Sequence, residues 1–125
     1  MKKFFTFLAA ALFAMTSFAA TVTFDAAVDK TDITTAAELT LVKDGVSIYV
    51  SKGILGNGQN YRFYKSQSTT ISCEYGNITS IEFTCLKEGT AQYGPGCFEI
   101  RSPQTGVYTY TGSVGTWTGD AESVT

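Results

Sequence analysis

Apolar and polar residues alternate with a period of two along most of the chain after residue 20. The pattern is clearest in residues 46–50 and 81–85, where apolar side chains occupy every second position. Successive side chains of a β-strand point to opposite faces, so this pattern predicts half-buried strands rather than helices. Similar alternation predicts further strands at residues 22–25, 62–64, 70–73, 98–101, 107–111 and 116–118. Residues 35–38 have the form of a helix-capping box, so we allow one helical turn there and otherwise expect strand over residues 39–42.

Turn-forming residues separate these segments. Clusters of glycine, asparagine, aspartate and proline lie at residues 43–45, 56–58, 75–77, 94–96, 103–106 and 118–120. About seven or eight short strands at this spacing are typical of a sandwich of antiparallel sheets. We therefore expect residues 21–125 to form a single all-β domain, a two-sheet antiparallel β-sandwich of jelly-roll-like type.

The first 20 residues have a different pattern, that of an export signal. Lys2 and Lys3 precede an apolar run over residues 4–18, and Ala19 and Ala20 supply the small residues typical of a cleavage site. The run is too short for a membrane-spanning helix. We expect residues 1–20 to be a signal peptide removed on export. The rest would be secreted, into the periplasm, onto the cell surface or outside the cell, without membrane attachment.

Charge and composition exclude several classes of function. The chain of 125 residues has 9 basic and 11 acidic side chains, and without Lys2 and Lys3 the net charge is −4. A mildly acidic domain without a basic stripe does not favour nucleic acid as a partner. The chain has no histidine, the commonest general base and metal ligand. Glu82 and Glu99 alternate with apolar residues, which predicts solvent-facing strand charges rather than a hydrolase pair. We therefore expect no catalysis, no metal and no cofactor.

Three cysteines stand twelve residues apart, at positions 73, 85 and 97. In an oxidising compartment one disulfide is expected, and a hairpin centred near Ala91 would bring Cys85 opposite Cys97. The two side chains fall on opposite faces in the alternation, so the Cys85–Cys97 pair requires a bulge, which Pro95 and Gly96 could provide. Two alternatives remain open, a pair between Cys73 and Cys85 and three buried thiols.

Aromatic residues are the candidate ligand-binding groups. Exposed tyrosine and tryptophan rings combine a flat apolar face with a polar edge, which suits stacking on a sugar or packing on a protein. The alternative is that the rings fill a small core. The candidates are Tyr49, Tyr108, Tyr110 and Trp117. We expect a non-catalytic module that binds glycan through these rings, or alternatively a structural or protein-interaction module of the bacterial cell surface.

Several segments together resemble a known group of proteins. They are Lys-Asp-Gly-Val-Ser-Ile at 43–48, Ser-Lys-Gly at 51–53, residues 61–64 with 70–72, residues 76–85, and Gly-Thr-Trp-Thr-Gly-Asp at 115–120 with the rest of the chain. In this order they are similar to a family of uncharacterised β-rich modules in secreted proteins of Gram-negative gut bacteria. The resemblance implies an exported β-sandwich that accompanies larger surface proteins, and it implies no catalytic residues.

The last residues begin a further alternation, with Val124 as its first apolar position. In the family that the chain resembles, this stretch continues through a further apolar strand. We therefore expect a domain truncated at its C-terminus, or one completed by a strand from a partner. An uncovered edge would follow, and with it a low melting temperature or association through that edge.

Overall fold

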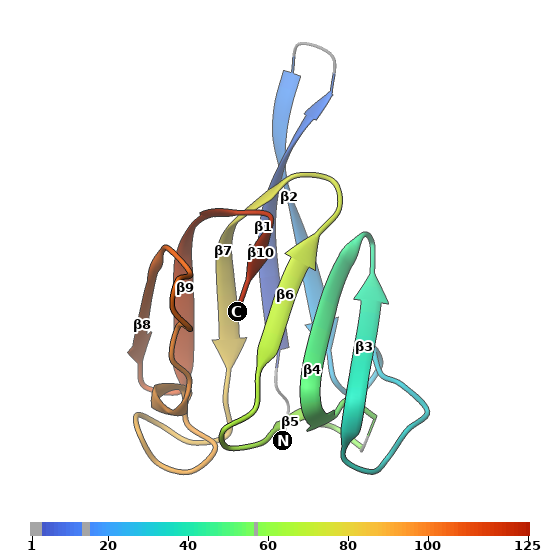
Figure 1. The fold of residues 1–125 in the computed structure, drawn as a ribbon, viewed down its shortest axis with the longest axis vertical. Coiled ribbons are helices and arrows are strands. Elements are labelled where there is room, and N and C mark those ends of the chain that lie inside the picture. Colours follow the sequence, from blue (N-terminus) through green and yellow to red (C-terminus); the bar gives the residue numbers. More distant parts are fainter. Residues whose placement is uncertain (1–3, 14–15, 57) are drawn as a thin grey trace.

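The computed structural model describes residues 4–13, 16–56 and 58–125, with side chains from residue 20 onward (Figure 1). The described chain forms two antiparallel sheets of five strands each. The first has the strand order β2-β1-β7-β9-β8, and the second has the order β10-β6-β4-β3 with β5 paired to β4. The expected all-β architecture of two antiparallel sheets is confirmed.

The strands of the first sheet are β1 (Phe4–Phe13), β2 (Thr16–Asp25), β7 (Asn77–Thr84), β8 (Val107–Thr111) and β9 (Val114–Ala121). Those of the second sheet are β3 (Ala37–Lys43), β4 (Val46–Ile54), β5 (Arg62–Phe63), β6 (Thr69–Cys73) and β10 (Ser123–Val124). One short 3-10 helix, η1, covers Pro95–Cys97. No helix in the described part of the chain is long and apolar enough to cross a membrane.

One hydrophobic core lies between the two sheets. In β4, Val46, Ile48 and Val50 are buried, whereas the residues between them are only partly covered, as the period-two pattern predicts. The first sheet contributes Phe24 and Ile81 to the same cluster, both almost inaccessible to solvent. Removal of these apolar faces from water is the main stabilising contribution, about 25 cal/mol per Å² buried.

Two of the predicted turns had opposite outcomes. At residues 43–45 the β3–β4 hairpin turns through Asp44 and Gly45, whose φ angles are 50° and 79°. Positive φ at both central residues matches the twist of a tight hairpin and explains the Asp-Gly pair. The turn predicted at 118–120 is wrong, because Gly119 and Asp120 lie inside β9. There the pairing with β7 shifts between Ile78 and Ser80, so the local signal marks a bulge.

The strand predicted at residues 98–101 is also wrong. Residues 85–106 form a long connection that contains η1, and the chain after η1 is extended without joining a sheet. Phe98 and Ile100 nevertheless pack against the core, and the Phe98 ring stacks on Phe83 with the centroids 4.9 Å apart. The alternation here reflects side chains that contact the core rather than a backbone ladder.

Residues expected to be a signal peptide form β1, in the interior of the first sheet, and the first half of the edge strand β2. β1 pairs with β2 on one side and with β7 on the other, antiparallel in both cases. The far end of the β1–β2 hairpin projects beyond the rest of the molecule (Figure 1). Residues 1–3 and 14–15 of this segment lie outside the described residues.

Candidate functional site

The four aromatic residues predicted to bind ligand do not form one surface. Tyr49 lies on β4 in the second sheet, where its hydroxyl donates to Glu38 Oε2 at 2.6 Å. This hydrogen bond to a carboxylate raises the pKa of Tyr49 above its usual value. Tyr108 and Tyr110 lie on β8, at the outer edge of the other sheet.

Trp117 belongs to the core, so its predicted place on a binding surface is corrected. Its side chain is 1% exposed, and its indole Nε1 donates to the Thr105 carbonyl at 3.1 Å. The chain passes directly over the ring at Gly106, where a Cβ would lie 2.3 Å from Nε1 and φ is +99°. In the sequence, Trp117 stands between the polar residues Thr116 and Thr118. Since neighbouring side chains of a strand point to opposite faces, this alternation was the signal that Trp117 faces the core.

Tyr108 is a packing residue with a satisfied hydroxyl. The ring is partly buried and meets Phe83 edge to face, with the centroids 6.3 Å apart. Its hydroxyl donates to the Pro95 carbonyl at 2.6 Å and so ties β8 to η1. Tyr110, two residues further along β8, keeps 44% of its surface exposed. Of the two rings on this strand, that of Tyr110 is the more exposed to solvent.

The burial of Tyr108 leads us to expect that the free energy of unfolding depends on pH. Burial raises the pKa of Tyr108 in the folded chain, whereas an unfolded tyrosine ionises near pH 10. The protonated side chain therefore makes its full contribution to the free energy of unfolding below about pH 10. This contribution falls at higher pH, because the tyrosine of the unfolded state loses its proton first. Tyr108→Phe should cost about 1 kcal/mol at pH 8, through the lost hydrogen bond. Urea unfolding at pH 8 and pH 11 should show this cost shrink.

Tyr110→Phe, a neighbour on the same strand, serves as the control and should change stability little at either pH. A cost of Tyr108→Phe that stays constant or grows between pH 8 and pH 11 would contradict the assignment of Tyr108 as a buried hydrogen-bond donor.

The predicted Cys85–Cys97 disulfide is not formed in the structure. All three cysteines are present as thiols, with Cys73 and Cys85 buried and Cys97 exposed. The expected hairpin around Ala91 is replaced by the loop that contains η1. There the Cys97 Sγ lies 3.3 Å from the Ala91 carbonyl oxygen, with hydrogen-bond geometry. Cys85 continues the inward face of Ile81 and Phe83, so the two sulfurs belong to different environments.

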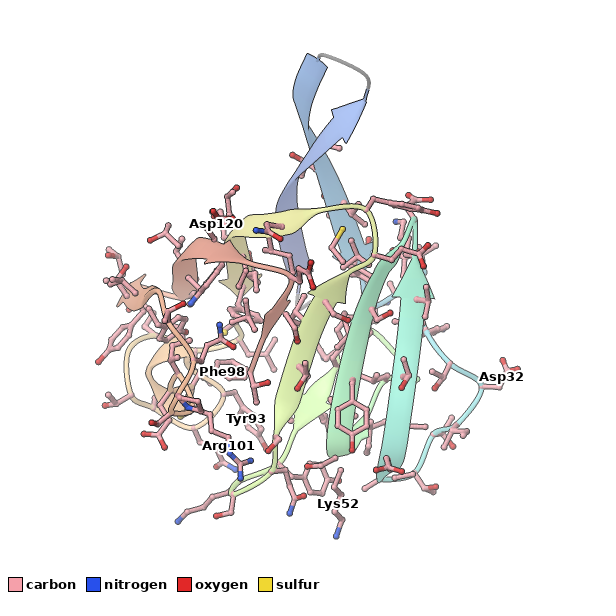
Figure 2. The ribbon with its side chains drawn as sticks, turned by 45° about the horizontal axis from the view of Figure 1, so that its top comes forward. Asp32, Lys52, Tyr93, Phe98, Arg101 and Asp120 are labelled. Carbon is pink, nitrogen blue, oxygen red and sulfur yellow. The ribbon has the colours of Figure 1, made fainter. Side chains whose placement is uncertain are left out.

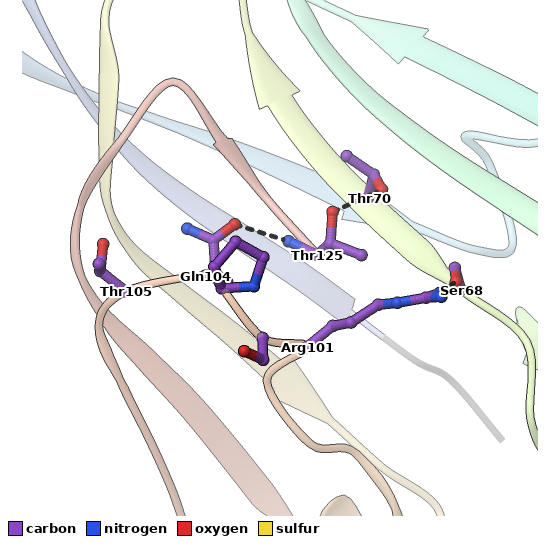
Figure 3. A pocket seen from close by; sticks show the side chains of 8 residues that line it. Ser68, Thr70, Arg101, Gln104, Thr105 and Thr125 are labelled. Carbon is purple, nitrogen blue, oxygen red and sulfur yellow. Dashed lines mark hydrogen bonds between the residues drawn. The ribbon is translucent and has the colours of Figure 1, made fainter.

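An open cleft between the β6–β10 edge of the second sheet and the loop at residues 101–105 is the candidate binding site (Figure 3). Its volume is about 550 Å³, within the usual range for small-ligand sites. Residues far apart in the sequence line it: Ser68, Thr70, Arg101, Ser102, Pro103, Gln104, Thr105 and Thr125. Seven of these eight residues carry a hydroxyl, amide or guanidinium group, so the cleft offers hydrogen-bonding groups beside a similar amount of apolar surface.

The cleft has three walls, formed by Ser68 with Thr70, by residues 101–105 and by Thr125, and hydrogen bonds join them. Thr125 contacts the other two walls, because its Oγ1 lies 2.9 Å from Thr70 Oγ1 and its backbone nitrogen donates to Gln104 Oε1 at 3.2 Å. The backbone nitrogen of Arg101 donates to the Thr125 carbonyl at 3.0 Å. The Arg101 guanidinium extends across the cleft, where Nη1 donates to Ser68 Oγ (Figure 3). An arginine offers five N–H donors, which suits recognition of hydroxyl or carboxylate oxygens.

An exposed aromatic residue, Tyr64, lies four positions before the cleft residue Ser68 in the sequence. Tyr64 is 37% exposed and begins the turn that leads to Ser68, with its carbonyl accepting from the Gln67 nitrogen at 3.2 Å. Lys52 Nζ lies 5.8 Å from the centre of the Tyr64 ring. Lys52 and Arg101 lie at the end of the molecule away from Asp120 (Figure 2). Tyr64 was not among the predicted site residues, since its exposure depends on how the turn folds.

Fold and site together define an all-β protein of two antiparallel sheets with an open cleft beside the edge formed by β6 and β10. Among the described residues, no group of three or more histidine, cysteine, aspartate or glutamate side chains is placed to hold a metal ion. No family model, no curated protein and no solved structure shows a match to this chain.

Proposed function

We propose that this protein is a secreted, non-catalytic glycan-binding module, a jelly-roll-like β-sandwich that holds its ligand in the cleft at Arg101. The observation that carries the proposal is the lining of that cleft, which joins a guanidinium, an amide and several hydroxyl groups in one concave site. Sugars present hydroxyl oxygens in every direction, and such side chains match them as donors and acceptors.

The connections between the sheets support the jelly-roll-like description. The chain passes from one sheet to the other between β2 and β3, between β6 and β7, and between β9 and β10. Repeated crossing between two packed antiparallel sheets is typical of Greek-key and jelly-roll sandwiches. Loops at one end of such a sandwich provide binding surfaces while the sheets keep them rigid.

Tyr64, exposed at the turn that leads to Ser68, is included in the proposal as a ring on which a bound sugar could stack. A tyrosine ring beside hydrogen-bonding groups can stack on the apolar face of a pyranose ring while neighbouring side chains hold its hydroxyl groups. Lys52, next to that ring, and Arg101 in the cleft are both cationic. A glycan that carries carboxylates would therefore bind more tightly than a neutral one of the same length.

The test is a glycan array probed with the full chain, with neutral and uronate-containing oligosaccharides as separate sets. Arg101→Ala should weaken binding at least about tenfold, since a hydrogen bond to a charged group contributes about 1.5–3 kcal/mol. Arg62→Ala is the matched control, because it removes the same charge from an exposed position on β5 outside the cleft lining. The control should bind as the unaltered chain does.

Three outcomes would contradict the proposal. The array could show no glycan bound, or Arg62→Ala could weaken binding as much as Arg101→Ala does. Alternatively, Tyr110→Ala alone could abolish binding, which would place the ligand on β8 rather than in the cleft.

A protein-interaction module of the cell surface is the second candidate, and the edge strand β8 favours it. β8 is the outermost strand of its sheet, with Val107 61% exposed and Tyr110 44% exposed. Edge strands with apolar side chains can pair with another chain. This function would be favoured if no glycan on the array bound and sedimentation experiments showed concentration-dependent association. An oligomer formed through the β8 edge would count as such association.

A further inference from the structure

We propose that the glycan site continues from the cleft onto the outer face of the second sheet, where Tyr49 is its aromatic platform, and that the ligand is an extended polysaccharide chain. The cleft holds one part of this chain, and the sheet face holds the sugar units that follow. The inference rests on the proposed glycan binding. It adds the length of the ligand and the surface along which the ligand lies.

Tyr49 lies directly beside a wall of the cleft. The cleft residue Thr70 is paired with Tyr49 across β6 and β4, and on its other side Thr70 Oγ1 lies 2.9 Å from Thr125 Oγ1. Directly opposed residues on neighbouring strands share a face of the sheet, with their Cβ atoms about 4.5–5.5 Å apart. The outer face of β4 therefore continues the surface that begins in the cleft.

A second row of contacts joins the cleft to β4. The Ser51 nitrogen donates to the Ser68 carbonyl at 2.9 Å, and the Ser68 nitrogen donates to Ser51 Oγ at 2.8 Å. Ser68 in turn accepts a hydrogen bond from Arg101 Nη1 at its own Oγ. These contacts fix the guanidinium of the cleft beside the outer face of β4.

The outer face of β4 and β6 carries hydroxyl groups and no charge. Its residues alternate with buried apolar residues, so their side chains point away from the core. They are Ser47, Tyr49, Ser51, Ser68, Thr70 and Ser72. In Figure 1 the first sheet lies behind this face, and no segment of the described chain crosses in front of β6, β4 and β3. Hydroxyl groups both donate and accept, as the hydroxyl groups of a neutral sugar unit require.

The Tyr49 ring is held in place before any ligand binds. Its hydroxyl donates to Glu38 Oε2 at 2.6 Å, and Glu38 lies on the neighbouring strand β3. A side chain that is already fixed loses little conformational entropy when a ligand packs on it. The ring thus offers a preorganised apolar surface among the hydroxyl groups, which suits stacking on a sugar ring.

The dimensions of this surface favour a chain over a single sugar. The row Thr125, Thr70, Tyr49 and Thr40 crosses β10, β6, β4 and β3 in the order in which they lie in the sheet. Neighbouring strands are about 4.7–4.9 Å apart, so the row extends over about 14 Å. A ligand that contacts the whole row must span several linked sugar units.

The experiment measures affinity against ligand length with the full chain, by isothermal titration calorimetry. The probes are the di-, tetra- and hexasaccharides of the uronate-containing polysaccharide that binds most tightly on the array. The affinity of the unaltered chain should rise with length. Tyr49→Ala should weaken hexasaccharide binding at least about fivefold, as expected for the loss of an aromatic contact, and should leave disaccharide binding unchanged. Tyr49→Phe keeps the ring and should keep the gain with length.

Tyr110→Ala is the matched control, because it removes an exposed tyrosine ring from the other sheet. It should bind every probe as the unaltered chain does. Equal affinity of the unaltered chain for the disaccharide and the hexasaccharide would overturn the inference, and this measurement needs no variant to fold. Equal losses in Tyr49→Ala and Tyr110→Ala would also overturn it. In both cases weaker binding by Arg101→Ala would leave the cleft as the glycan site, whereas an array without any bound glycan would overturn the proposed function as well.

Discussion

Removing residues 1–20 should lower the melting temperature by more than about 10 °C, or make the chain associate into larger oligomers, because the deletion takes away an interior strand. β1 pairs on both sides, so its loss interrupts the first sheet between β2 and β7 and leaves two edges unpaired. In a domain of this size, a loss of 1 kcal/mol lowers the melting temperature by about 4–8 °C. Thermal melts followed by circular dichroism, and light scattering at two concentrations, measure both effects.

A chain that lacks only residues 1–3 is the control for this deletion, because it keeps all of β1 while losing Lys2 and Lys3. It should melt as the full chain does. A monomer of residues 21–125 that unfolds cooperatively above about 65 °C would show that the domain does not need this strand, since that temperature exceeds the usual range.

Trp117→Ala should destabilise the fold by about 3–5 kcal/mol, as expected when a buried large aromatic side chain is removed and a cavity remains. Trp117 is among the largest fully buried side chains of the described chain, and the substitution also removes the hydrogen bond to Thr105. Urea unfolding of the full chain measures the change in free energy. The loop at Gly106, which crosses the ring, should lose its order in the same variant.

Tyr110→Ala is the matched aromatic control, and its exposed ring should cost less than about 1 kcal/mol. The sequence hypothesis placed both residues on a ligand-binding surface. A Trp117→Ala chain that kept its stability but lost glycan binding would restore that hypothesis and contradict the core assignment.

The arrangement of the candidate site could not be read from the sequence. The cleft joins Ser68, Arg101 and Thr125, which lie just before β6, in a long loop and just after β10. No local pattern marks these residues, because each is a common polar side chain in its own segment. The predicted aromatic set failed for a related reason, since Tyr49 and Tyr108 lie in different sheets and Trp117 faces inward.

By itself, the sequence determined the all-β character of this protein and the tight turn at Asp44 and Gly45. Both depend on nearest neighbours, through side-chain alternation in strands and the φ angles that a turn demands. Only the tertiary structure decided that residues 98–101 contact the core without joining a sheet, that Gly119 and Asp120 form a bulge, and that β1 lies between β2 and β7. These outcomes depend on which distant segments pair and pack, and alternation along one segment carries no information about its partners.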